Sequence, residues 1–210
     1  MKRVLSMFVL LAAFLSLSFA SVTPHIAVKL QVSDTKQIFC SGFVIDDVRH
    51  YVLTADHCII NEPFHIGELR ATEVFHVPEL DIAVVEAPGA YGKSLKPSLR
   101  APAPGEQIRA IGFAEGGKEA KILTMRMLLP MMKIFGFEGV YSIYADEVIQ
   151  GMSGGPVLNA QGDVITMVQQ MNGNGRFSIS VPIPYIYEAT RPYWKYQGPP
   201  MLGEPENPHA

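Results

Sequence analysis

The stretch GMSGGPV, residues 151–157, places a serine between glycines, ahead of a proline and an apolar run. Residues 151–155 satisfy the G-x-S-x-G pattern of an α/β-hydrolase nucleophile elbow. In that fold the catalytic histidine follows the serine and a helix starts directly behind it. Here five histidines precede Ser153, and His209, which follows it, is the penultimate residue. Pro156 opens a strand–turn–strand pattern instead of a helix, so the elbow fails both tests.

The opposite order of residues, histidine then aspartate then serine, is present. His57 lies in LTADHC at the end of an apolar strand pattern, and Asp81 lies in LDIAVV at the start of another. In such a set the serine hydroxyl attacks a carbonyl, the histidine removes its proton, and a buried aspartate orients the imidazole. A single histidine or aspartate at a strand end is usually structural. Because His57, Asp81 and Ser153 occur together in the order that such a set requires, the catalytic interpretation is favoured over the structural one.

The first twenty residues read as a leader. Lys2 and Arg3 precede an apolar run, and Ser18-Phe19-Ala20 supplies small residues at both positions that a signal peptidase inspects. We expect residues 1–20 to be a signal peptide that is cleaved after Ala20. The alternative is an uncleaved anchor helix, since the run approaches the ~20 residues that span a membrane.

Charge and cysteine content restrict the partners and the compartment. Without Lys2 and Arg3 the mature chain keeps 15 of the 17 basic residues against 20 acidic ones, a net charge of about −5. The chain has no cluster of basic residues that could contact the phosphates of a nucleic acid, which argues against nucleic acid as a partner. Cys40 and Cys58 are the only cysteines. A disulfide between them suits a secreted or periplasmic protein, and two free buried thiols are the alternative.

After the leader the apolar residues recur with period two, which predicts short strands separated by turns. A segment rich in proline, glycine and serine divides the chain into two β halves. The expected parts are an N-terminal barrel at 21–90, a linker at 91–106, a C-terminal barrel at 107–196 and a flexible tail at 197–210. The methionine-rich residues 122–137 predict a core strand plus loop, or a flexible apolar surface.

Four blocks in order, FCSGFVI, LTADHC, LDIAVV and GMSGGPV, resemble the signature blocks of trypsin-like serine proteases of the chymotrypsin fold. The resemblance covers residues 36–190. It implies an all-β chain with two six-stranded antiparallel β-barrels and an active site between them. That implication agrees with the division of the strand pattern into two halves.

The resemblance also implies roles for particular residues. Ser153 is the nucleophile, His57 the general acid and base, and Asp81 the orienting carboxylate. The backbone N–H groups of Gly151 and Ser153 form the oxyanion hole. Thr166 falls where the family places a small hydroxyl residue that supports the aspartate, although a plain strand threonine is the alternative. No metal or organic cofactor is implied.

Cys40 and Cys58 match the family disulfide that connects the strand before the histidine to the histidine's own turn. Closing that loop would stabilise the fold by about 3 kcal/mol in the chain-entropy model. Asp56, next to His57, is a poor orienting partner, because neighbours in an extended segment point to opposite sides.

Two positions bear on the branch of the family and on specificity. Met152 stands where digestive members carry the aspartate that pairs with a new N-terminal ammonium, so that activation route is not implied. The departure points to the bacterial and viral branches, and FSISVPIPYI resembles the wall strand of bacterial periplasmic heat-shock proteases, here without their C-terminal peptide-binding domain. Glu147 precedes Ser153 by six residues, where an acid would favour Lys or Arg substrates; a surface-loop acid is the alternative.

The sequence thus predicts an exported serine endopeptidase that acts on proteins or peptides through a covalent acyl-enzyme. A membrane contact is expected only if the leader remains as an anchor. The competing hypothesis is a catalytically silent module that uses the same cleft to bind peptides or a partner, because fold and residue identities alone do not establish turnover.

Overall fold

The computed structural model describes residues 26–32, 38–59, 63–90, 92–132, 141–145, 148–171 and 177–202. The expected signal peptide and Glu147 lie outside these residues. Within the part of the chain that is described, no helix is both long enough and apolar enough to cross a membrane.

The first sheet holds seven antiparallel strands in the order β5-β4-β1-β2-β3-β7-β6. Its central strands bury nearly every side chain, as in β7, where Ile82 to Val85 are inaccessible to solvent. β-branched residues suit this pleated, buried position. The strands are β1 (Val28–Val32), β2 (Ile38–Asp46), β3 (Tyr51–Thr54), β4 (Phe64–Ile66), β5 (Leu69–Arg70), β6 (Thr72–Val77) and β7 (Ile82–Glu86).

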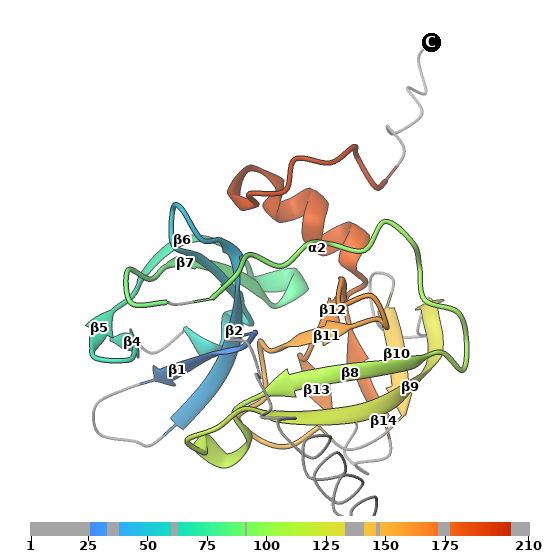
Figure 1. Cartoon of the computed structure of the whole chain (residues 1–210), viewed down its shortest axis with the longest axis horizontal. Helices are drawn as coiled ribbons and strands as arrows, with labels where there is room; N and C mark the ends of the chain where they lie inside the picture. Colours follow the sequence, from blue (N-terminus) through green and yellow to red (C-terminus); the bar gives the residue numbers. More distant parts are fainter. Residues whose placement is uncertain are drawn as a thin grey trace, which may run out of the picture.

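The second sheet also holds seven antiparallel strands, in the order β12-β11-β8-β9-β10-β14-β13. In Figure 1 it occupies the right half of the molecule, and the green connection from the first sheet reaches it past helix α2. The strands are β8 (Gln107–Gly112), β9 (Lys121–Met132), β10 (Tyr141–Ala145), β11 (Pro156–Leu158), β12 (Val164–Met167), β13 (Gln170–Met171) and β14 (Phe177–Ser180).

These two curled sheets confirm the predicted double-barrel class, and within the described residues each half has seven strands instead of the expected six. Each sheet includes one strand of two residues, β5 or β13. A two-residue strand is too short to show an alternating pattern.

Strand β9 accounts for the described part of the methionine-rich segment. Met125 and Met127 are buried in the core of the second sheet, whereas Leu128, Leu129 and Met131 are exposed. The expected core strand is therefore present, with an apolar surface on its outer side. Residues 133–137 of the segment lie outside the described residues.

Helix α2 (Ile183–Thr190) was not predicted, because the expected strand FSISVPIPYI includes residues 183–186, whereas β14 ends at Ser180. Pro184 lies in the first turn of the helix, where its missing N–H has no intrahelical role. After the helix, Trp194 is fully buried against Phe43 of β2, with ring centroids 6.3 Å apart. The N–H of Gly198 donates to the Tyr187 hydroxyl (3.1 Å), so this part of the expected tail contacts the helix.

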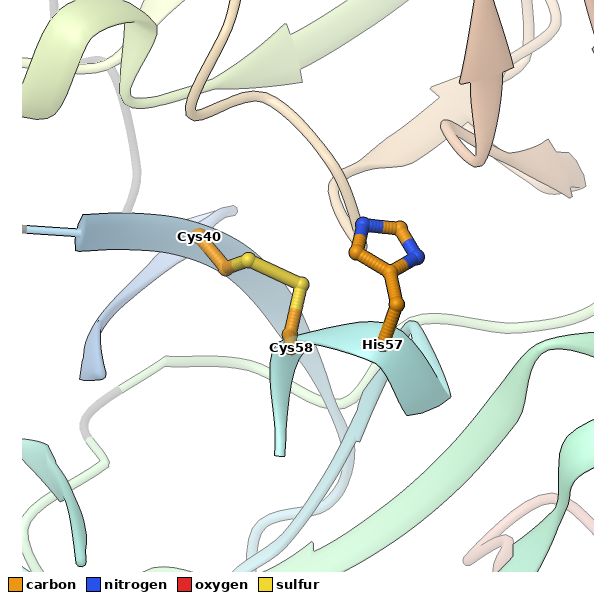
Figure 2. Close-up of side chains that lie close together, drawn as sticks. All are labelled: Cys40, His57 and Cys58. Carbon is orange, nitrogen blue, oxygen red and sulfur yellow. A yellow bond between two sulfur atoms is a disulfide. The ribbon is translucent and has the colours of Figure 1, made fainter. Parts of the chain in front are cut away.

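Cys40 of β2 and Cys58 form a disulfide with a sequence separation of 18. Cys58 ends the 3₁₀ turn Asp56–Cys58, which directly follows β3. The bond therefore attaches the turn that contains His57 to β2, as Figure 2 shows. Strand β2 lies in the middle of the first sheet.

Removing this bond is expected to destabilise the fold. A Cys40→Ser/Cys58→Ser variant should lose about 3 kcal/mol of the free energy of unfolding, because the unfolded chain regains the entropy of an open loop. Urea unfolding with and without reductant measures the loss, and reductant should shift the midpoint of the wild type but not that of the variant. Equal midpoints for the wild type in both conditions would contradict the expectation.

Candidate active site

Asp81 contacts His57 at two places. The His57 ring Nδ1 lies 2.8 Å and 3.0 Å from the two carboxylate oxygens, and the His57 backbone N–H donates to Oδ1 over 2.9 Å. A carboxylate partner keeps the proton of the neutral imidazole on Nδ1. The other ring nitrogen, Nε2, is then an acceptor. The ring is therefore oriented by both its side chain and its backbone.

Asp81 follows the 3₁₀ turn Pro78–Leu80 and immediately precedes β7. Its backbone is left-handed, with φ 51° and ψ 51°. Aspartate tolerates this region better than most residues, and such positions gather at functional sites. The strained residue places its carboxylate on His57 at the start of β7.

Gln169 of the second half supports this turn. Its Nε2 donates to the carbonyl oxygens of Leu80 (2.6 Å) and Asp81 (2.9 Å), and its Oε1 accepts the N–H of Val181 (2.7 Å). Gln169 was not predicted as a site residue. The only local signal is a glutamine directly after the apolar run at residues 164–168, which contains β12.

Thr166 does not take the contact expected of it. Its hydroxyl is fully buried and donates to the carbonyl of Val181 over 2.6 Å. The reason is its place in β12, where Thr166 pairs with Pro182 through an isolated bridge. Contact with the turn of Asp81 comes from Gln169 instead.

The electrostatics of the pair favour a charged imidazole. The hydrogen bond to Asp81 raises the pKa of His57 above its ordinary value, and the negative charges of Asp81 and Asp56 act in the same direction. Partial burial opposes them. The side chain remains 43% exposed, so a substrate can reach it.

Ser153 lies beside the turn of His57. Its carbonyl accepts the N–H of Ser41 over 2.7 Å and lies 3.9 Å from Cys58 Sγ. Gly154 allows this approach, because a Cβ there would lie 2.1 Å from the Ser41 carbonyl oxygen, and because its φ is +82°. Elements 95 residues apart in sequence thus meet at the serine.

Ser41, which was not predicted as a site residue, connects the two halves at this point. It is fully buried, and its hydroxyl donates to the carbonyl of Gly151 while accepting the N–H of Phe113, each over 2.8 Å. Its own carbonyl accepts the hydroxyl of Thr54 over 2.8 Å. The only sequence signal is a small polar residue next to Cys40.

All four carbonyls of residues 150–153 accept hydrogen bonds. Besides the two Ser41 contacts, Gln150 accepts from Glu115 N (2.6 Å) and Met152 from Gly155 N (2.9 Å). Met152 N donates to Ile149 O, and Gly154 N to Val168 O. Among the contacts of the described residues, the N–H groups of Gly151 and Ser153 have no acceptor. The side chain of Met152 is fully buried in the second core.

One group of metal-ligating residue types lies close together among the described residues. The candidate ligand atoms of Cys40, His57 and Cys58 lie within 4.8 Å of one another (Figure 2). Both sulfurs are bonded to each other, so neither is available as a thiolate ligand.

Comparison with known proteins supplies the family. The family model of the trypsin-like peptidase domain matches residues 40–167, more than half of the chain. Comparison of the sequence with curated proteins finds no match.

Solved structures share the fold at low sequence identity. The Rv3671c protease from M. tuberculosis, in its active form, matches with a TM-score of 0.70 and 19% identity, over 85% of this chain and 84% of that one. The HtrA-type protease AlgW with a tripeptide matches with a TM-score of 0.69 and 15% identity, over 82% and 61%.

The serine endoprotease from Yersinia pestis matches with a TM-score of 0.66 and 17% identity, over 81% of this chain and 63% of that one. The chain therefore belongs to the trypsin-like peptidase domain family and is a serine peptidase of the chymotrypsin fold.

Proposed function

We propose that the chain is an exported endopeptidase that hydrolyses peptide bonds through Ser153, His57 and Asp81 and a covalent acyl-enzyme. The observation that carries the proposal is the double contact of Asp81 with His57 beside the turn of Ser153. Export rests on the leader pattern of residues 1–20. A peptide substrate fits the family, and one structural relative, AlgW, has been solved with a tripeptide.

In this mechanism the Ser153 oxygen attacks the scissile carbonyl carbon and its proton passes to His57 Nε2. Asp81 stabilises the resulting imidazolium. His57 then protonates the leaving amine, the C–N bond breaks, and the acyl group stays on Ser153. A water molecule, deprotonated by His57, attacks the ester; the bond to the Ser153 oxygen then breaks, His57 returns the proton to that oxygen, and the acid is released. The pKa of His57 is raised but the imidazole must be neutral to start the cycle, so acid conditions slow it.

Gly151 and Ser153 are proposed as the oxyanion donors. In a trans peptide the C=O and N–H point in opposite directions. Because the Gln150 and Met152 carbonyls are bound by Glu115 and Gly155, the N–H groups of Gly151 and Ser153 point away from those partners. Preorganised donors of this kind stabilise the tetrahedral oxyanion without reorganising during the reaction.

A fluorophosphonate probe tests the nucleophile. The wild type should be labelled on Ser153 and Ser153→Ala should not, while Asp81→Asn should label more slowly by roughly 10⁴-fold, since the imidazole loses its orienting partner. Ser94→Ala, the same change in the connecting segment, is the matched control and should label normally. A wild type that stays unlabelled would instead indicate a silent binding module, and equal labelling of Ser153→Ala would show that Ser153 is not the group that reacts.

Substitution of Ser41 tests the support of the oxyanion turn. Ser41→Ala leaves the Gly151 carbonyl and the Phe113 N–H buried without their partner, at a cost of about 1–3 kcal/mol. We expect kcat to fall about tenfold to a hundredfold with a small change in KM, because the turn supports the transition state more than the bound substrate. Steady-state kinetics on a peptide substrate measures both.

The matched control is Ser98→Ala, because Ser98 is also buried and its hydroxyl donates to the Arg100 carbonyl away from the site. It should lower stability without changing kcat. If Ser41→Ala retains full kcat, or if both variants lose kcat equally, Ser41 does not position the turn.

A further inference from the structure

Two side chains on one face of the β1–β2 pair contact the second half of the molecule. Lys29 of β1 lies directly opposite Ser41 of β2, and residues opposite each other in a sheet share a face. The Ser41 hydroxyl accepts the N–H of Phe113. The ammonium of Lys29 donates to the carbonyl of Gly116 over 2.5 Å. The turn Ala114–Gly116 is therefore held at both of its ends by the first half.

Phe39 of β2 fixes the position of the Lys29 ammonium. The ammonium lies 4.1 Å from the centroid of the Phe39 ring, which is within the distance of a cation–π contact. Phe39 also packs closely on Gly116, where an added Cβ would lie 2.1 Å from the ring atom Cδ2. The charge is thus held beside the Gly116 carbonyl, and a charge-assisted hydrogen bond is stronger than a neutral one.

The turn that Lys29 contacts has an unfavourable backbone conformation. Glu115 lies in the left-handed region, with φ 52° and ψ 26°, and its side chain is exposed. Gly116 follows with φ +68°. A left-handed glutamate is strained, and the strain persists only where surrounding contacts enforce it. The hydrogen bonds from Ser41 and Lys29 on either side of Glu115 are contacts of this kind.

Glu115 binds the peptide group that contains the Gly151 N–H. Its backbone N–H donates to the carbonyl of Gln150 over 2.6 Å. Gly151 lies directly against the turn, because a Cβ there would be 2.5 Å from the Phe113 carbonyl oxygen and 3.1 Å from Glu115 N. In a trans peptide the N–H points away from the C=O. The turn therefore determines the direction of the Gly151 N–H.

We propose that Lys29 is a positioning residue for the oxyanion hole. It acts through the turn Ala114–Gly116 on the Gln150–Gly151 peptide, without contacting the reacting atoms. The inference deepens the proposed function and rests on it in one respect, that the Gly151 N–H binds the oxyanion. Without the ammonium, Glu115 is free to relax, its N–H leaves the Gln150 carbonyl, and the Gly151 N–H loses its fixed direction.

Hydrogen exchange in the full chain, followed by NMR, tests the anchoring and needs no turnover. Lys29→Met removes the ammonium and keeps an unbranched apolar side chain beside Phe39. The Glu115 N–H should then exchange about tenfold faster, because its turn opens more readily. Lys29→Arg should restore most of the protection, since a guanidinium also donates to carbonyls and stacks on aromatic rings.

Steady-state kinetics on a peptide substrate test the effect on catalysis. In Lys29→Met, kcat per active site titrated with the fluorophosphonate probe should fall about tenfold, with KM changed by less than about twofold. The reason is that the oxyanion donors bind the transition state rather than the bound substrate. Lys29→Arg should recover most of kcat.

Lys195→Met is the matched control. It removes another ammonium with a short contact, to Asp47 over 2.6 Å, and Asp47 directly follows the end of β2 that lies away from Phe39. This variant should change neither the exchange of the Glu115 N–H nor kcat.

Unchanged exchange of the Glu115 N–H in Lys29→Met would overturn the proposal whatever the activity. Faster exchange with an unchanged kcat, or equal effects in Lys195→Met, would overturn it as well. If Lys29→Met does not fold, Lys29→Gln, which has a shorter neutral side chain, takes its place with the same expected results. In a wild type without turnover the proposed function fails, and the exchange of the Glu115 N–H then decides alone whether Lys29 holds the turn.

Discussion

The two hydrogen bonds from Ser41 to the turn of Ser153 are the contact on which the proposed active site depends. The backbone N–H of Ser41 binds the carbonyl of Ser153, and its hydroxyl binds that of Gly151, 110 residues away in sequence. Ser41 is fully buried, so neither carbonyl can exchange its partner for water without cost. The approach is close enough to require glycine at position 154. The conformation of the turn is therefore fixed by the opposite half of the molecule.

Support also runs in the other direction. Gln169, from the second half, binds the carbonyls of Leu80 and Asp81 and so fixes the turn that presents the carboxylate to His57. Each half therefore holds one part of the proposed catalytic set in place for the other. This reciprocity gives a physical reason for a site at the junction of two sheets, where small shifts of one half would misplace groups from both.

The features that could be predicted from the sequence are those with a local signature. The period-two pattern and the four ordered blocks gave the fold class, and the disulfide followed from the matching cysteine positions. Helix α2 was missed because its apolar residues continue directly from β14 and only Pro184 marks its first turn. The contacts of Ser41 and Gln169 could not be predicted, since each depends on segments that are distant in the sequence. Thr166 shows the same limit, because its hydroxyl binds Val181 rather than the expected neighbour.

A structure of the chain with a peptide boronate, which mimics the tetrahedral intermediate, tests the central claim most directly. The account predicts a bond from boron to Ser153 Oγ, with His57 Nδ1 still on Asp81. It also predicts one boronate oxygen about 2.7–3.1 Å from the backbone nitrogens of both Gly151 and Ser153. A boronate bound without a bond to Ser153, or with that oxygen directed away from both nitrogens, would contradict it.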